Sequence, residues 1–200
     1  MKRLLMIAAL LGMSAGTATA FSGVDPDWPC IQRKQPHLSL GQVWTGPAPT
    51  AEDEGLARSR PIVNLAERLV QRRLPIPDAQ NEIAAFAETV GDHELTALMI
   101  AIFERIDRDR SGLIEGIARY GHKQVDLAAS IEKRRVEMAE MEAAENPDYD
   151  AIDAAEKALD WEVRIFTDRQ HALTYVCETP VIMEQRIFAL GRSIVAGLHE

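Results

Sequence analysis

Apolar residues recur every seven positions in the last third of this 200-residue chain. The series comprises Ile152, Leu159, Phe166 and Leu173, and Val163 and Cys177 each follow one of its members by four residues. Spacings of three, four and seven residues place these side chains along one stripe of an α-helix, which must pack against a partner helix. The pattern predicts a helix from about residue 148 to Cys177 whose buried stripe faces an antiparallel neighbour.

The expected partner lies just before this helix. A charged helical pattern runs from about Ser111 to Glu145, and the run Asn146-Pro147-Asp148 interrupts it. Asp148 has the side chain of a good N-cap for the following helix. A short break between two long helices predicts an αα-hairpin over about residues 111–177.

Helix-starting and helix-stopping residues divide the rest of the chain; they are Pro61, Pro75, Asp78, Gly91, Asp92 and Pro180. They predict helices from 61 to about 74, from 78 to 90, from 92 to about 106 and from 181 onward. The sequence has no useful β alternation and no repeat of 20–50 residues. The predicted fold is all-α, a helical bundle with a long antiparallel hairpin occupying part of residues 61–200.

The stretch over residues 21–60 predicts an irregular arm. Proline fixes φ and removes a backbone donor, which disfavours long helices there. Ser39 is placed to cap one short helical turn ending at Trp44. The prolines of this arm are Pro26, Pro29, Pro36, Pro47 and Pro49. Its two tryptophans, Trp28 and Trp44, indicate that the arm docks on a core.

The first twenty residues have the order of a secretory signal peptide. Lys2 and Arg3 form a positive start, residues 4–13 are almost wholly apolar, and small residues run to Ala20. The apolar run is too short for a membrane anchor, since a spanning helix needs roughly 20 residues. We therefore predict cleavage after Ala20 and export to the periplasm, with no transmembrane anchor in the mature chain.

The net charge disfavours some classes of binding partner, and the two cysteines predict a covalent cross-link. The formal net charge is −9, and loss of Lys2 and Arg3 makes it more negative, which disfavours nucleic acid and anionic lipid. Two cysteines in an oxidising compartment predict a disulfide between Cys30 and Cys177. Two free thiols or a metal-binding or redox pair are the alternatives, although the spacing is not C-x-x-C.

One segment resembles part of a calcium loop. Oxygen-bearing side chains occupy loop positions 1, 3, 5 and 9, and Gly112 occupies position 6; they are Asp107, Asp109, Ser111 and Glu115. Position 12 of the 107–118 segment is Ala118, where a calcium loop needs a bidentate Glu. The alternative is a helix break in which Ser111 caps the next helix.

A second metal hypothesis follows from the hairpin. If the turn centres near Pro147, His122 lies level with His171, and Asp126 lies level with Asp168. Helical phase directs Asp168 away from the seam, which favours an interpretation as surface residues. Neither a nucleophile motif such as G-x-S-x-G nor a phosphate-binding Gly-rich loop occurs, so a hydrolase would need a carboxylate pair that sequence does not reveal.

Four runs lie near the two ends of the predicted mature chain: Asp27-Trp28-Pro29-Cys30-Ile31-Gln32-Arg33-Lys34, Val43-Trp44-Thr45-Gly46-Pro47, Tyr175-Val176-Cys177-Glu178 and Glu184-Gln185-Arg186-Ile187-Phe188-Ala189-Leu190. These runs resemble the corresponding ends of an uncharacterised family of exported proteobacterial proteins. The resemblance implies an exported helical protein and supports pairing of the two cysteines. It implies no activity and no catalytic residue.

These observations favour a non-enzymatic periplasmic accessory or adaptor protein that binds another envelope protein through the charged hairpin. A metal-binding protein, using calcium at residues 107–118 or a softer ion at the His/Asp set, is the alternative. A hydrolase with an unrecognised carboxylate site is the second alternative. No cofactor other than calcium is suggested, and the sequence leaves the oligomeric state open.

Overall fold

A computed structural model describes residues 28–199 of the chain. These residues form helices and no strands, which confirms the all-α fold class. In chain order the helices are α1 (Leu40–Val43), α2 (Ala51–Leu56), α3 (Arg60–Leu69), α4 (Ile76–Ala87), α5 (Asp92–Glu142) and α6 (Tyr149–Ala196).

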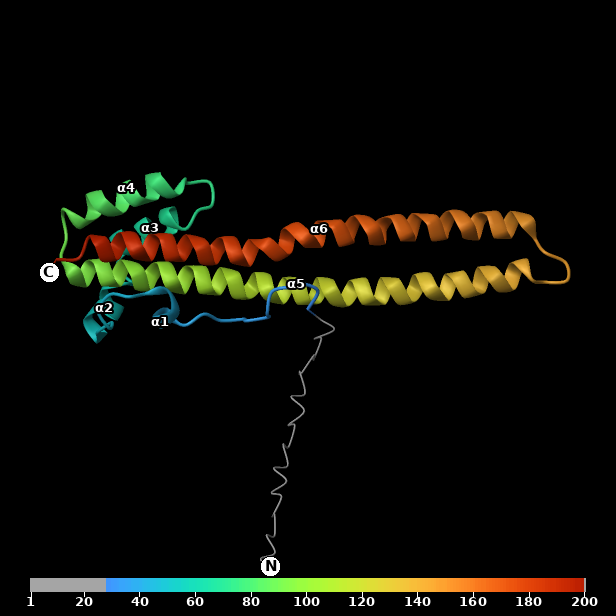
Figure 1. The fold of residues 1–200 in the computed structure, drawn as a ribbon, viewed down its shortest axis with the longest axis horizontal. Coiled ribbons are helices and arrows are strands. Elements are labelled where there is room, and N and C mark those ends of the chain that lie inside the picture. The colour runs from blue at the N-terminus through green and yellow to red at the C-terminus, as the bar shows by residue number, and fades with distance from the viewer. Residues whose placement is uncertain (1–27, 200) are drawn as a thin grey trace, which may run out of the picture.

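The dominant feature is a hairpin of two very long helices, α5 and α6, which lie side by side over their whole length (Figure 1). The four short helices gather around the end where α5 begins and α6 finishes (Figure 1). There α2 and α3 pack on α5, and α1 and α4 pack on α6. We call this end of the molecule the base, and the far part of the hairpin extends from it without cover from any other described helix.

The hydrophobic core lies in the base. Its fully buried side chains come from α3 and α4 and from the adjoining ends of α5 and α6; the largest are Leu69, Ile83, Leu95, Leu98, Met99, Ile102, Ile187, Leu190 and Ile194. Burying one such side chain stabilises a fold by about 1.5–3 kcal/mol. The base is therefore the stable platform that holds the hairpin.

The seven-residue series on α6 faces α5 as predicted. Leu159 is buried, and the other members of the series between Ile152 and Cys177 are half-buried. The series continues through Pro180, Ile187 and Ile194, all of which are buried. A sustained seven-residue spacing is typical of helices that coil around each other.

The predicted helix break at Ser111 was wrong. Helix α5 continues through residues 107–118, because Ile106, Ile114 and Ile117 keep the helical spacing of the seam and are buried. Tertiary packing of an apolar stripe outweighs the weak helix preference of Asp, Ser and Gly.

The predicted start of a new helix after Pro180 was also wrong. Proline removes one backbone hydrogen bond and costs a helix interior about 3 kcal/mol. Here Pro180 lies inside α6 and is itself buried on the seam, so packing on both sides carries the helix across it. The hairpin therefore spans 92–196 and not 111–177.

The shorter elements agree with the sequence at only some of their ends. Ser39 is the N-cap of α1, and Asp148 caps α6 by accepting from the backbone N–H groups of Asp150 and Ala151, both at 3.1 Å. Helix α3 ends at Leu69 and not near residue 74, and α4 runs from Ile76 to Ala87 and not from 78 to 90, so Asp78 lies in its first turn and is not the cap. Helix α2 lies within the arm that was predicted to be irregular. The predicted signal peptide and its cleavage at Ala20 lie outside the described residues.

Candidate functional site

The segment that resembles a calcium loop is helical. A calcium loop turns sharply at its sixth position, whereas Gly112 lies within α5 and no described glycine has a positive φ. At 100° per residue Asp109 points about 200° away from Asp107, and it pairs with Arg105 on its own helix at 2.9 Å. The prediction of a loop over 107–118 was therefore wrong, because Asp107, Asp109, Ser111 and Glu115 cannot converge from one continuous helix.

Asp107 and Ser111 instead hold the arm on α5. The two carboxylate oxygens of Asp107 contact the backbone N–H of Leu38 at 2.8 Å and Nδ1 of His37 at 3.0 Å. The hydroxyl of Ser111 donates to the carbonyl of Pro36 at 2.6 Å and lies 3.0 Å from the same imidazole nitrogen. These contacts fix residues 36–38 along the hairpin, and Glu115 pairs with Arg119 at the exposed surface.

Arg110, which lies between Asp107 and Ser111 on α5, connects this helix with α6 and with the arm. It was not identified from the sequence. Its side chain is buried and its Nε donates to the carboxylate of Glu184 on α6 at 2.8 Å. Its Nη1 donates to the carbonyl of Gln35 at 2.6 Å. A buried cation shared by both hairpin helices and the arm is a cross-brace, and its only sequence signal was a charge at a seam position.

The His/Asp set predicted as a second metal site lies on the surface. His122, Asp126, Asp168 and His171 are all exposed, and His122 lies 3.9 Å from Asp126 one turn along its own helix. Within residues 28–199 no group of three or more His, Cys, Asp or Glu side chains is arranged to hold a metal ion. The sequence predicted equal heights along the hairpin for His122 with His171 and for Asp126 with Asp168. Equal height is not enough to bring all four side chains to the contact between α5 and α6.

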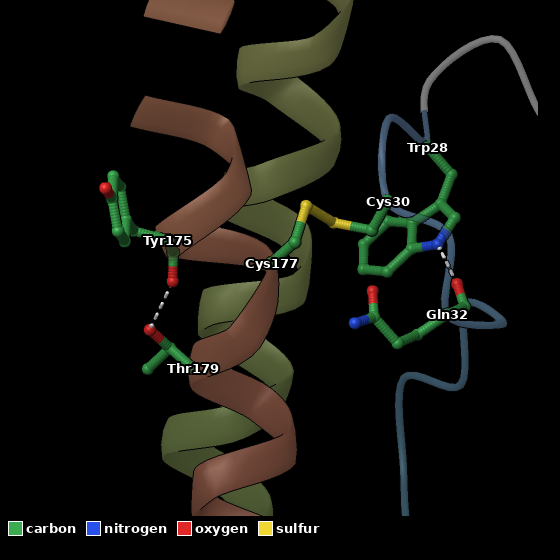
Figure 2. The surroundings of a disulfide bond; sticks show 6 residues. All are labelled: Trp28, Cys30, Gln32, Tyr175, Cys177 and Thr179. Carbon is green, nitrogen blue, oxygen red and sulfur yellow. Dashed lines mark hydrogen bonds between the residues drawn. A yellow bond between two sulfur atoms is a disulfide. The ribbon is translucent and has the colours of Figure 1, made fainter. Parts of the chain in front are cut away.

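The disulfide lies midway along the hairpin. Cys30 of the arm is bonded to Cys177 of α6, with their Cα atoms 5.5 Å apart, as the cysteine count predicted (Figure 2). The indole of Trp28 lies beside this bond and donates to the carbonyl of Gln32 (Figure 2). Because residues 35–38 are fixed on α5, the disulfide holds the start of the arm against the other helix.

Arm and hairpin enclose a groove of about 790 Å³. Its walls are mainly apolar, and the lining includes Trp28, Val125, Phe166 and Leu173 together with both cysteines. One buried amide crosses its floor: Gln124 of α5 donates to the carbonyl of Phe166 on α6 at 3.2 Å. The disulfide therefore forms part of the wall of an apolar depression.

The far end of the hairpin has a different surface. Residues 136–162, called the tip below, contain one basic residue, Lys157, and ten acidic residues, of which nine are exposed: Glu137, Glu140, Glu142, Glu145, Asp148, Asp150, Asp153, Glu156 and Asp160. Three large apolar side chains among them are also exposed, with relative exposures of 52% for Val136, 75% for Tyr149 and 62% for Trp161. The preceding cations pair locally, Lys133 with Glu137 and Arg134 with Glu162.

A buried carboxylate, that of Asp53, and a buried guanidinium, that of Arg186, stabilise the base. The buried Asp53 accepts from the backbone N–H of Thr50 at 2.7 Å and lies 2.7 Å from Nδ1 of His93. Desolvation raises the pKa of Asp53, but the hydrogen bonds from Thr50 and His93 outweigh it and lower the pKa overall. The hydrogen bond to Asp53, helped by its negative charge, raises the pKa of His93.

Arg186 is the second group. Its side chain is buried, and it donates to the carbonyls of Leu69 at 2.7 Å and Leu74 at 2.9 Å, so it caps the end of α3 and the following loop. Burial lowers the pKa of this guanidinium. This cation therefore has a structural role in the base.

Among residues 28–199 no helix is both long enough and apolar enough to cross a membrane. Comparison with protein-family models, with curated proteins and with solved structures gives no match for this chain.

Proposed function

We propose that this protein is a non-enzymatic periplasmic adaptor whose hairpin tip binds a basic surface of another envelope protein. The observation that carries the proposal is the tip itself, where one basic residue accompanies ten acidic ones and exposed aromatic side chains. The base and the braced arm would hold the hairpin while the tip reaches the partner.

The division of the molecule supports an adaptor. The core is confined to the base, while the far half of the hairpin is covered by no other described helix (Figure 1). Each of its helices buries one stripe on the other and leaves its remaining faces exposed. Faces without an intramolecular partner are available for an intermolecular one.

The chemistry of the tip specifies the kind of partner. A concentrated negative charge speeds association with a positive surface and opposes acidic partners. Trp and Tyr are the residues that most often contribute the largest binding energies in protein interfaces. Trp161 and Tyr149 supply such anchors within the charged region. The expected partner surface is rich in Arg or Lys and has apolar depressions for one or two aromatic rings.

The location in the periplasm rests on the first twenty residues and on the disulfide. A cross-link between Cys30 and Cys177 is typical of proteins in oxidising compartments. The order of a positive start, an apolar run and small residues ending at Ala20 is that of an export signal. Together they support an exported protein that acts within the cell envelope.

Site-specific photocross-linking in intact cells tests the proposal. A photoreactive residue replaces Trp161 or Tyr149 in the tip, and Phe188, which is 40% exposed in the base, serves as the control position. We expect one discrete adduct from both tip positions and none from the control. The same adduct from all three positions, or none from the tip, would contradict the proposal.

Neutralising charge gives the second arm of this experiment. The tip variant carries Glu140→Gln, Glu142→Gln and Glu145→Gln, and the matched control carries Glu54→Gln, Glu88→Gln and Glu104→Gln, all exposed in the base. We expect the tip variant to reduce the adduct about tenfold, since three interfacial charges at about 0.5 kcal/mol each amount to one decade of affinity. Equal adduct yields from the two variants would show that charge does not recruit the partner.

A further inference from the structure

We propose that the Cys30–Cys177 disulfide is a reversible clasp, open to exchange with an external dithiol, whose reduction frees residues 28–33 of the arm and uncovers the apolar groove. The site is a redox-modification site, and its substrate class is a protein or small-molecule dithiol. The inference is independent of the proposed binding at the tip.

The position of the disulfide makes it accessible. Both cysteines are half-buried and line the open groove, and they are not enclosed in the core of the base. Thiol–disulfide exchange requires an attacking thiolate to reach one sulfur from outside. A groove of about 790 Å³ beside the bond provides room for that approach.

The contacts of the arm make the effect local. Pro29, Ile31, Gln32 and Arg33 are exposed, and the hydrogen bond of Trp28 to Gln32 lies within the arm itself. Further along the arm, the carbonyl of Gln35 accepts from Nη1 of Arg110 on α5. Reduction therefore removes the covalent tether of residues 28–33 and leaves the next attachment point intact.

The groove opens as a consequence. Trp28 and its neighbours 29–32 form one wall, and α5 and α6 form the others. When this wall moves away, the half-buried Phe166 and Leu173 lose the cover that the arm provides. The hydrophobic core of the base is made of other side chains than those that line the groove, so the base stays folded while the groove opens.

The chemistry balances with one dithiol. A thiolate of the external dithiol attacks one of the two protein sulfurs, the S–S bond breaks, and the departing sulfur takes up a proton as a cysteine thiol. The second thiol of the reductant then attacks the mixed disulfide and releases the other cysteine. Two electrons and two protons pass to the protein, and the external dithiol becomes a disulfide.

The first test measures the rate of reduction in native buffer. The oxidised mature protein is treated with dithiothreitol, free thiols are alkylated, and mass spectrometry follows Cys30 and Cys177. We expect complete reduction much faster than global unfolding, whose rate is measured in parallel by extrapolation from urea. Reduction that proceeds only at the global unfolding rate would overturn the proposal, because the bond would then be inaccessible in the folded protein.

The second test measures mobility by NMR relaxation of backbone amides. In the reduced protein we expect order parameters below about 0.6 at residues 29–33 and rigid values near 0.85 at residues 37–39 and in the base. The variant with Cys30→Ser and Cys177→Ser should match the reduced protein without any reductant. Residues 29–33 that remain rigid, or a base that loses its helices on reduction, would contradict a local clasp.

Discussion

Two glycine-to-alanine substitutions test the unbroken course of the hairpin helices, with opposite expected signs. Gly112 lies within α5, is exposed, and a Cβ built on it meets no heavy atom within 4 Å. Alanine is about 1 kcal/mol more favourable than glycine in a helix interior. Gly112→Ala should therefore stabilise the protein by about 1 kcal/mol, or 2–4 °C in Tm for a chain of this size.

Gly191 is the matched control in α6. A Cβ there would lie 2.9 Å from the backbone carbonyl oxygen of Val43 and 3.5 Å from Sδ of Met99. The carbonyl oxygen cannot rotate away, so the helix must shift, and overpacking of this kind costs about 1–3 kcal/mol. After subtraction of the gain of about 1 kcal/mol in helix propensity, Gly191→Ala should destabilise the base by up to about 2 kcal/mol.

Equilibrium urea unfolding of the oxidised protein measures both changes. A left-handed turn at position 112, as a calcium loop requires, would make Gly112→Ala destabilising by 1 kcal/mol or more. That result, particularly if calcium raised the stability of the parent protein but not of the variant, would refute the continuous α5 and restore the calcium-loop hypothesis. Opposite signs at the two glycines support the structure.

Three further predictions concern polar groups. The buried guanidinium of Arg110 pairs with the carboxylate of Glu184, so Arg110→Met should lower the free energy of unfolding in urea by about 3 kcal/mol and Glu184→Gln by about 1 kcal/mol. A double-mutant cycle should give a coupling energy of at least about 0.5 kcal/mol. Additive effects would argue against the pairing. Arg186→Met should cost about 2 kcal/mol by leaving the carbonyls of Leu69 and Leu74 unpaired, and a neutral effect would show that water replaces the side chain. The raised pKa of His93 means that its contribution is complete below about pH 6.5 and lost as pH rises through the folded pKa, whereas the lowered pKa of Asp53 means that its contribution is present above about pH 3.8 and lost as pH falls. The difference in urea midpoint between the parent and His93→Gln should therefore be larger at pH 5 than at pH 8.5, and equal differences would contradict the pair.

The sequence predicted the parts of the fold that depend on local spacing. The seven-residue series on α6, the cap at Asp148 and the short turn after Ser39 are all visible in neighbouring residues, and they lie where expected. The disulfide followed from the number of cysteines and the expected compartment. Local signals fail where distant packing opposes them, which explains why α5 and α6 continue through Ser111 and Pro180.

The candidate site was harder to predict for a physical reason. Arg110 and Arg186 bond to backbone carbonyls far away in the chain, and a carbonyl acceptor has no sequence signature. The side chains of Asp107 and Ser111, which were predicted to bind calcium, instead form hydrogen bonds with the backbone of the arm. The acidic tip, by contrast, could have been recognised by counting charges along residues 136–162.

A rigid hairpin that carries the tip far from the base is the feature that the proposed adaptor most needs. Helix α5 has 51 residues, so its length is about 75 Å at a rise of 1.5 Å per residue. Small-angle X-ray scattering of the oxidised protein, at a concentration where it is monomeric, should give a maximum dimension of at least about 75 Å and a radius of gyration of about 22 Å or more, as expected for a rod of that length. A compact particle with a radius of gyration near 16 Å, the value for a globular domain of this size, would contradict the extended hairpin and with it the proposed adaptor.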